Sequence, residues 1–291
     1  MKTKVFILIL AIIMGLSFAA CTSAPAPAAQ EPAAEAPAPA AQEPAADAPA
    51  PADDEQEIDS DYVLRKGAMI VGYTVFAPMN YTDDDGNFTG FDTELTIKVC
   101  EMLGVAPDFV EIDWSTKEIE LSAKNIDAIW NGMTITPERQ AEMYMTKPYL
   151  QNAQVIVMKA DAEYVNTESL AGMAIVAEMG SAGEKTIEED PGLSQGTYIA
   201  KDKQTSCLME VAAGTADAAV LDLTLAMAMI GEGSDYANLA IKDSLNPEYY
   251  GIAFRQGSDL RDKVDAILDE LYQNGSMQEL AEKYELVLAS R

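Results

Sequence analysis

The residues of this chain that could bind a ligand are concentrated at 131–139, Asn-Gly-Met-Thr-Ile-Thr-Pro-Glu-Arg. The apolar run 126–130 before them indicates a buried strand. Thr136 is typical of a helix N-cap, and the proline that follows it favours the first helical position. We expect the chain to turn at Gly132 and enter a helix whose free N–H groups attract an anion, with the guanidinium of Arg139 beside them. These residues predict a carboxylate site, and an ordinary strand–loop–helix junction with a surface arginine is the alternative.

Strands and helices alternate on both sides of this run and must position it. The order strand, helix, strand, helix, strand that leads up to it predicts a parallel sheet flanked by helices, and a second series follows it. The expected strands are 69–73, 107–113, 126–130, 154–158, 173–177, 196–200, 216–221, 239–242 and 249–254. The expected helices are 91–103, 114–123, 183–189, 204–213, 223–230, 258–273 and 277–286.

Two of the predicted strands deliver a polar residue at their carboxyl ends. The segments 125–129 and 215–219 each follow a helix and begin a strand, and these strands lead to Asn131 and Asp222. In open α/β sheets, ligands bind outside the carboxyl ends of the strands. We therefore expect two similar α/β lobes that face one another across a ligand cleft.

Composition restricts the chemistry further. The 291 residues include no histidine, which excludes His-based catalytic triads, zinc sites and general bases. The net charge of −29 disfavours nucleic acid and anionic lipid as partners. The acidic run 83–87 has the spacing of a turn and not of a calcium loop, so that no metal is expected. Cys100 and Cys207 fall in helical patterns and are expected to be small buried residues, although a disulfide between them is permitted.

The first 61 residues are expected to be separate from the folded head. Residues 1–20 combine two lysines with an apolar run and end in Ala-Ala before Cys21, which predicts a signal peptide. This ending resembles the bacterial lipobox, which implies lipidation of Cys21 (with palmitate among the acyl chains); a secretory signal with an incidental cysteine is the alternative. Residues 21–61 consist mainly of Ala, Pro, Gln and acids, and predict a disordered tether between a membrane anchor and the head.

The head resembles the amino-acid-binding proteins of bacterial ABC importers, solute-binding protein family 3, which have the type 2 periplasmic binding fold. The resemblance covers essentially all of the head, and the segments that carry it are 75–81, 90–92, 126–139, 180–181, 216–222 and 249–253. It implies two α/β lobes with a ligand cleft between them, joined by two hinge crossovers. Lobe 1 would be 62–150 plus 250–291, and lobe 2 would be 151–249.

The family pattern also implies how a ligand is held. Arg139 would clamp the α-carboxylate of an amino acid, with help from the backbone of Gly132 and from Thr134, and Asp222 would receive the α-ammonium. A zwitterion loses its hydration in a cleft, so each of its charges needs a fixed partner of opposite charge there. The implied ligand-binding residues are Phe76, Trp114, Asn131, Gly132, Met133, Thr134, Arg139, Gly180, Ser181, Ala182, Gly183 and Asp222.

Several of these roles have plainer alternatives. Asp222 could be a helix N-cap, Phe76 and Trp114 could belong to the core, and the glycine-rich loop 180–183, expected to offer N–H groups to the ligand, could be only a turn. Other residues depart from the common family pattern or could meet a polar ligand side chain, which leaves the identity of the amino acid open. These side-chain pocket candidates are Tyr73, Met79, Lys117, Glu178, Met179 and Leu221.

The expected function is that of an extracytoplasmic substrate-binding lipoprotein. It would capture a polar L-amino acid by cleft closure and deliver it to the transmembrane subunits of an ABC transporter permease. We expect a monomer without cofactor or catalytic residues, anchored to the bacterial cell membrane through Cys21. The alternatives are an amino-acid sensor subunit on the same fold and a dehydratase-like enzyme, which would need a general base near the cleft.

Overall fold

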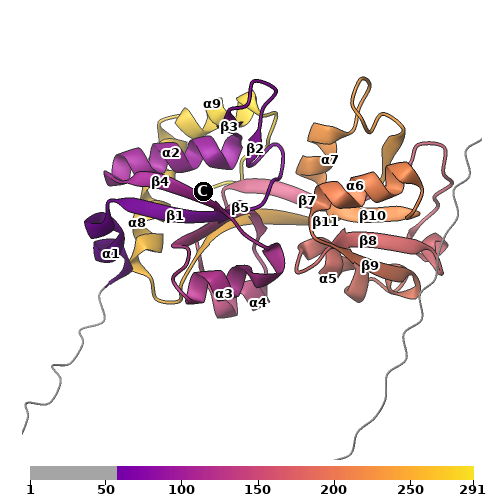
Figure 1. The fold of residues 1–291 in the computed structure, drawn as a ribbon, viewed down its shortest axis with the longest axis horizontal. Coiled ribbons are helices and arrows are strands. Elements are labelled where there is room, and N and C mark those ends of the chain that lie inside the picture. Colours follow the sequence, from indigo (N-terminus) through magenta and orange to yellow (C-terminus); the bar gives the residue numbers. More distant parts are fainter. Residues whose placement is uncertain (1–57) are drawn as a thin grey trace, which may run out of the picture. The chain divides into compact units, whose positions relative to one another are not determined.

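The computed structural model describes residues 58–291, which form an α/β fold with helices on both sides of its main sheet (Figure 1). The strands are β1 (Ala68–Tyr73), β2 (Tyr81–Thr82), β3 (Phe88–Thr89), β4 (Ala106–Glu111), β5 (Ala128–Thr134), β6 (Tyr144–Met145), β7 (Leu150–Lys159), β8 (Ala174–Glu178), β9 (Thr197–Lys201), β10 (Ala218–Asp222) and β11 (Leu239–Phe254). The α-helices are α1 (Asp59–Lys66), α2 (Phe91–Leu103), α3 (Lys117–Ser122), α4 (Pro137–Glu142), α5 (Ala182–Glu189), α6 (Gln204–Ala213), α7 (Leu223–Met229), α8 (Asp259–Gln273) and α9 (Ser276–Lys283), and the short 3-10 helices are η1 (Trp114–Thr116), η2 (Thr167–Leu170) and η3 (Leu193–Gln195).

The main sheet has nine strands in the order β4-β1-β5-β11-β7-β10-β8-β9, with β6 added to β11. In lobe 1, β1 pairs in parallel with both β4 and β5, as the alternation of strands and helices predicts. In lobe 2, β8 pairs in parallel with β9 and β10. Figure 1 shows the two lobes side by side, with β7 and β11 running between them. The fold is therefore the predicted one of two α/β lobes joined by two crossovers.

The strand that carries the predicted carboxylate site is longer than predicted. β5 continues to Thr134 instead of ending near Trp130, and Gly132 lies within it at φ +57° instead of forming a turn after it. A Cβ atom on Gly132 would lie 2.6 Å from the Phe76 ring. Glycine is needed here because it alone combines this backbone angle with the close approach of an aromatic ring. The helix start after the strand is as predicted, since Thr136 Oγ1 accepts from the Arg139 N–H at 3.2 Å.

The second crossover, β11, differs from the prediction of two separate strands at 239–242 and 249–254. It is a single strand that runs antiparallel to β7, with irregular register between Ile241 and Asp243 and between Ser244 and Pro247. The polar residues and the proline interrupt the apolar pattern, and the irregular pairing accommodates them within one strand. Because β7 and β11 belong to both halves of the sheet, the residue bounds of the lobes stay a prediction.

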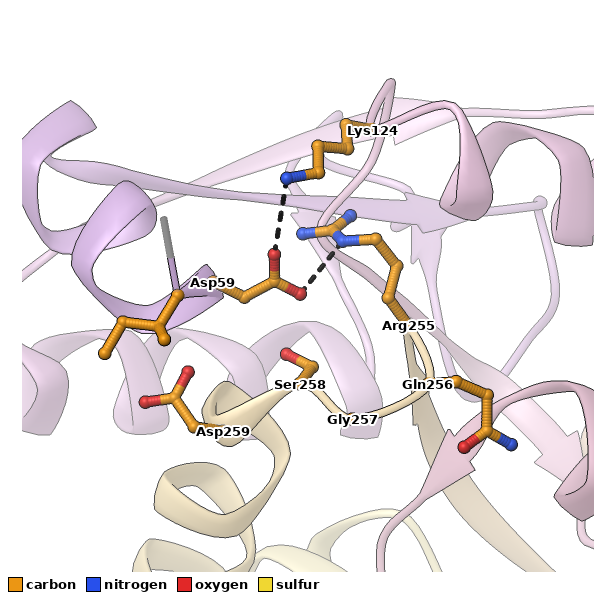
Figure 2. Close-up of a pocket in the computed structure, with 8 residues that line it drawn as sticks. Asp59, Lys124, Arg255, Gln256, Gly257, Ser258 and Asp259 are labelled. Carbon is orange, nitrogen blue, oxygen red and sulfur yellow. Dashed lines mark hydrogen bonds and ion pairs between the residues drawn. The ribbon is translucent and has the colours of Figure 1, made fainter. Parts of the chain in front are cut away.

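Residues 59–66 form α1, although the predicted tether extends to residue 61. Only Ser60 and Val63 of this helix are buried, so its sequence carries little apolar pattern. Polar contacts hold it to lobe 1: the Ser60 N–H donates to Asp259 Oδ1 at 3.0 Å, and Arg255 Nε lies 2.9 Å from Asp59 Oδ2 (Figure 2). The predicted signal peptide, Cys21 and the tether up to residue 57 lie outside the described residues.

A hollow of about 260 Å³ lies where α1 meets the start of α8, and Figure 2 shows its lining. Arg255 lines this hollow, and its guanidinium donates to acceptors of the protein itself. Besides Asp59, these are the carbonyls of Leu121 at 3.2 Å and Ile126 at 2.7 Å and the carboxylate of Asp127 at 3.4 Å. The hollow is therefore a structural junction between α1 and lobe 1.

The core covers both faces of the sheet. Alternate residues of β7 point to opposite faces, so that Val155 and Val157 join one apolar cluster while Ile156 and Met158 join another. Cys100 and Cys207 are buried and free, which agrees with the expected role of small core residues. No helix within residues 58–291 is long and apolar enough to cross a membrane.

Candidate functional site

A small cavity lies between the two lobes. Phe76, Trp114, Asn131, Gly132, Thr134 and Arg139 line it from lobe 1, and Glu178, Ser181, Gln204 and Asp222 line it from lobe 2. Eight of these ten residues belong to the predicted ligand-binding set, the exceptions being Glu178 and Gln204. The free volume is about 10 Å³, roughly the space of a single water. A ligand as large as an amino acid therefore enters only if the lobes separate or the lining rearranges.

Arg139 reaches from α4 across the cavity to the other lobe. One terminal nitrogen donates to the carbonyl of Thr134 at 2.9 Å, and the other donates to the carbonyl of Gly180 at 3.1 Å. A guanidinium has five N–H donors, and no described residue accepts from the remaining three. Arg139 is thus fixed in place at the cavity with donors to spare for an anionic group.

Asn131 and Gly132 line the cavity, but their polar groups are engaged within the protein. The Asn131 amide exchanges hydrogen bonds with Thr74 and donates to Asn80 Oδ1 at 2.7 Å. The N–H of Gly132 donates to Asp92 Oδ2 at 2.7 Å. These bonds use the polar capacity of both groups, so they position the strand that leads to Arg139 and leave little for a ligand.

Asp222 ends β10 and precedes α7, yet its side chain does not cap that helix. Its Oδ1 accepts from Gln154 Nε2 at 2.9 Å and from Asn152 Nδ2 at 2.5 Å, and its Oδ2 accepts from Gln204. The N–H of Thr224 donates instead to the side-chain oxygen Oδ1 of Asn152 at 3.2 Å. The alternative of Asp222 as a side-chain N-cap is therefore wrong, and its carboxylate is oriented by three amides.

Glu248 of β11 lies directly behind Asp222 and shares its partners. Its Oε1 accepts from Gln154 Nε2 at 2.9 Å and from Thr134 Oγ1 at 2.9 Å. Burial, together with the charge of Asp222, raises the pKa of Glu248 to about 8. Asp222 and Glu248 therefore form a buried acidic pair that connects the two lobes through Thr134.

Four of the predicted site residues lie outside the cavity lining. The Met133 side chain is fully buried in an apolar cluster that also includes Trp114. The Gly180 N–H donates to Glu184 Oε2 at 2.6 Å, and Ala182 begins α5. Gly183 packs tightly, since a Cβ atom there would lie 2.6 Å from the Val220 carbonyl oxygen. Of the glycine-rich loop only Ser181 lines the cavity, and its N–H donates to the Glu178 carbonyl at 3.2 Å.

Lys117 and Glu178 bring two more charges to the site. Lys117 is buried and donates to the carbonyls of Trp114 and Gly180, both at 3.1 Å. Burial, with Arg139 nearby, lowers the pKa of Lys117. Burial, with Asp222 nearby, raises the pKa of Glu178 to about 8. Among the candidates that the sequence left open, these two are therefore inside the protein and not at its surface.

Sequence reasoning missed the amides that orient Asp222. Gln204 begins α6, and Asn152 and Gln154 lie in β7. Gln154 alternates with the apolar residues of β7 and is 1% exposed. A buried polar side chain on an otherwise apolar strand was the available signal for a partner nearby. Within residues 58–291, no group of acids and cysteines is arranged to hold a metal ion.

Comparison with known proteins places this geometry in a family. Residues 69–286 match the family model of bacterial extracellular solute-binding proteins, family 3. The probable amino-acid-binding protein YxeM of Bacillus subtilis is 31% identical over 236 residues, which cover 78% of this chain and 85% of that protein. The L-cystine-binding protein TcyJ of Escherichia coli strain K12 is 26% identical over 228 residues, covering 76% of this chain and 84% of that protein.

A solved structure agrees in fold as well as in sequence. A crystal structure of a mutant of ArgBP from T. maritima superimposes with a TM-score of 0.72 at 31% identity, covering 78% of this chain and 99% of that chain. The residues matched by the family model, 69–286, include β2 to β11 and therefore both lobes and the crossovers. The chain belongs to the bacterial extracellular solute-binding proteins, family 3, and has the type 2 periplasmic binding fold.

Proposed function

We propose that this protein captures a polar L-amino acid in the cavity between its lobes and delivers it to the permease of an ABC transporter. The observation that carries the proposal is that Arg139 from lobe 1 and Asp222 from lobe 2 line the same cavity. These two charges match the carboxylate and the ammonium of an amino acid. The related proteins named above, which bind L-cystine or are described as amino-acid-binding, support this ligand class.

Placing the two charges on different lobes couples binding to closure. A zwitterion that touches Arg139 alone keeps its ammonium unpaired, and only the closed form offers both partners. The Arg139–Gly180 hydrogen bond of 3.1 Å already joins the lobes in the structure. The ligand would add its own bridge to that contact, so a bound amino acid favours the closed form over the open one.

The protein acts by binding and not by catalysis in this proposal. The acids whose pKa is raised to about 8 are Glu178, which lines the cavity, and Glu248, which lies outside the lining, and they are the nearest candidates for a general base. The negative charge of nearby Asp222 helps to raise both pKa values, and a bound cation would favour ionisation of these acids. Loss of an amino acid from solution without the appearance of a product distinguishes capture from a dehydratase-like reaction.

Calorimetric titration of the purified full chain with each of the twenty amino acids tests the proposal. We expect at least one L-amino acid to bind with a Kd around micromolar or tighter, which corresponds to about −8 kcal/mol. The matching D-amino acid is the control, because an inverted α-carbon cannot present both charges and the side chain to the same groups. Absence of heat and of a thermal shift with all twenty would overturn the proposal.

The proposal includes a lipid anchor at Cys21, which rests on the residues before it. Labelling of the chain with radioactive palmitate in a bacterial host, followed by membrane fractionation, measures it. We expect label and membrane association in the native chain and loss of both in Cys21→Ser. Cys100→Ser is the control, since Cys100 is buried in the core and should not affect labelling. Equal labelling of the native chain and Cys21→Ser would contradict the anchor.

A further inference from the structure

Glu178 ends β8 and is a buried acid with binding capacity left over. Its side chain lines the cavity and is 4% exposed as a residue. Its Oε1 atom is buried and accepts no hydrogen bond from any residue within 58–291. A buried carboxylate oxygen without a donor is costly, and most such atoms in proteins have a partner. This atom is therefore a place where a hydrogen-bond donor of the ligand would be stabilised.

The other acid in the lining has much less capacity to spare. Asp222 accepts from the amides of Asn152, Gln154 and Gln204. A carboxylate has about four acceptor positions, so three amide donors leave Asp222 room for roughly one more. That position suits the single ammonium of the ligand backbone. A second cationic group on the ligand would need a second acid, and Glu178 is beside the same cavity.

Lys117 does not compete for an acidic ligand side chain. Its ammonium has three protons, and three acceptors surround it: the Trp114 and Gly180 carbonyls at 3.1 Å each and Glu118 Oε1 at 3.0 Å. The buried ionisable groups around the cavity are three acids, Glu178, Asp222 and Glu248, and two bases, Lys117 and Arg139. Burial helps to keep Glu178 and Glu248 protonated below a pKa of about 8, so Glu178 carries little charge in the empty cavity and ionises when a cationic group of the ligand binds it.

We propose that the cavity selects an L-amino acid with a cationic side chain, such as arginine, lysine or ornithine, and that Glu178 binds this second positive charge. The inference rests on the proposed capture of an amino acid and specifies its chemical class. Glu178 is in this reading a specificity-determining residue. The backbone charges of the ligand go to Arg139 and Asp222, which would serve any amino acid.

Proton release gives this inference a second readout. Charged and titratable groups face Glu178 from several elements: Lys117 of α3, Arg139 of α4, Asp222 of β10, and Asp202, Lys203 and Cys207 at α6. Burial and Asp222 keep the Glu178 carboxyl protonated up to a pKa of about 8, against the opposing effect of Lys117. A cationic ligand needs the carboxylate, so its binding releases a proton and tightens as the pH rises from 6 to 8.

Calorimetry on the purified full chain with L-arginine, L-lysine, L-glutamine and L-glutamate tests the inference. We expect arginine or lysine to bind at least about tenfold more tightly than glutamine. Glu178→Gln has nearly the same shape and should weaken the basic ligands at least about tenfold while glutamine changes less than about threefold. Glu178→Asp keeps a carboxylate and should keep the preference for basic ligands. Glu188→Gln changes an exposed acid of α5 outside the cavity lining and should change the binding of neither class.

Titration of arginine in two buffers of different ionisation enthalpy measures the proton. We expect net release near pH 7 in the native chain and its loss in Glu178→Gln. Tighter binding of glutamine or glutamate than of every basic amino acid would overturn this inference and leave the proposed capture standing. Equal weakening of arginine and glutamine by Glu178→Gln would overturn it as well, because Glu178 would then serve the ligand backbone. Binding of none of the twenty amino acids would overturn the proposed function and this inference together.

Discussion

The two halves of the cavity are built in different ways. The lobe 1 half comes mainly from one continuous stretch, 131–139, which runs along β5 and into α4 and ends in a base. The lobe 2 half gathers its residues from three separate segments, 178–181, Gln204 and Asp222, and it is acidic. One half is therefore encoded locally, whereas the other exists only after distant strands and helices have packed together.

The two halves also hold their charged groups differently. Arg139 is held by backbone carbonyls, so its position depends on the path of the chain. Asp222 is held by the side chains of Asn152, Gln154 and Gln204, which it partly shares with Glu248. A substitution in the first half should act alone, and a substitution in the second half should shift the protonation and contacts of its neighbours.

Arg139→Ala has the largest expected effect, because no other base lines the cavity among the described residues. We expect the affinity for the best amino acid ligand to fall about 100-fold, or about 2.7 kcal/mol, as measured by calorimetry. Arg139→Lys keeps the charge but lacks the planar guanidinium, so its affinity should lie between those of Arg139→Ala and the native chain. If Arg139→Ala bound the ligand within threefold of the native affinity, Arg139 would not belong to the site. The lobe 1 half would then lack its charged group.

Gly132→Ala tests whether the lobe 1 half depends on its backbone path. The added Cβ would meet the Phe76 ring at 2.6 Å, and it would stand at a positive φ of +57°. We expect the free energy of unfolding to fall by about 2 kcal/mol, as measured by urea denaturation. Gly86→Ala is the matched control, since it shares a positive φ of +84° but meets nothing within 4 Å. Equal losses for the two variants would show that the Phe76 contact contributes nothing.

Asp222→Asn tests the shared network of the lobe 2 half. The substitution removes the charge that attracts the ligand ammonium but keeps an oxygen for the surrounding amides. We expect about a tenfold loss of affinity, or about 1.4 kcal/mol. Because Asp222 raises the pKa of Glu178 and Glu248, the variant should also lower both values. Carbon-detected NMR of the carboxyl groups measures those values, and unchanged titrations would contradict a shared network.

The smallest expected effect is on the pH dependence of the free energy of unfolding, which should differ between variants of the two halves. Burial raises the pKa of Asp92, in lobe 1, to about 7. It also raises the pKa of Glu248, beside Asp222, to about 8. The folded state then holds protons that the unfolded state has lost above about pH 4, so stability falls as the pH rises through the folded pKa. One such group changes stability by at most about 1.4 kcal/mol per pH unit.

Thermal unfolding of the full chain at pH 5 to 8 measures this dependence. Asp92→Asn should flatten the decline mainly between pH 5 and 7, and Glu248→Gln should flatten it up to pH 8. Glu189→Gln, an exposed acid of α5, is the control and should leave the decline unchanged. A decline with the native slope in both test variants would show that these buried acids ionise as freely as exposed ones.

Much of the lobe 1 half could be predicted because its signals are local. Thr136 and Pro137 start α4 where expected, and Arg139 in its first turn reaches the cavity. The same reasoning misplaced Gly132, because a positive φ within a strand depends on the Phe76 ring, which is far along the chain. Residues 59–61 were missed for a similar reason, since polar contacts with Asp259 and Arg255 stabilise α1 more than its own apolar pattern does.

Only part of the lobe 2 half could be predicted from the sequence. Asp222 was identified because it follows an apolar strand, but its amide partners lie on β7 and α6 and carry no local mark of that role. The loop 180–183 looked like a source of free N–H groups. Instead, Glu184 accepts from the Gly180 N–H and its own N–H donates to the Ser181 side chain, so both residues are used to start α5.

The sequence by itself determined the α/β alternation, the family and the two opposite charges of the site, because periodicity, capping residues and short motifs are properties of neighbouring residues. Only the tertiary structure decided which of the polar groups remain available to a ligand. Hydrogen bonds between residues far apart in sequence use up Asn131 and the Gly132 N–H, and the three protons of Lys117 face Trp114, Glu118 and the distant Gly180. Because a donor or acceptor serves few partners at once, the groups left over, on Arg139, Asp222 and Glu178, define the site.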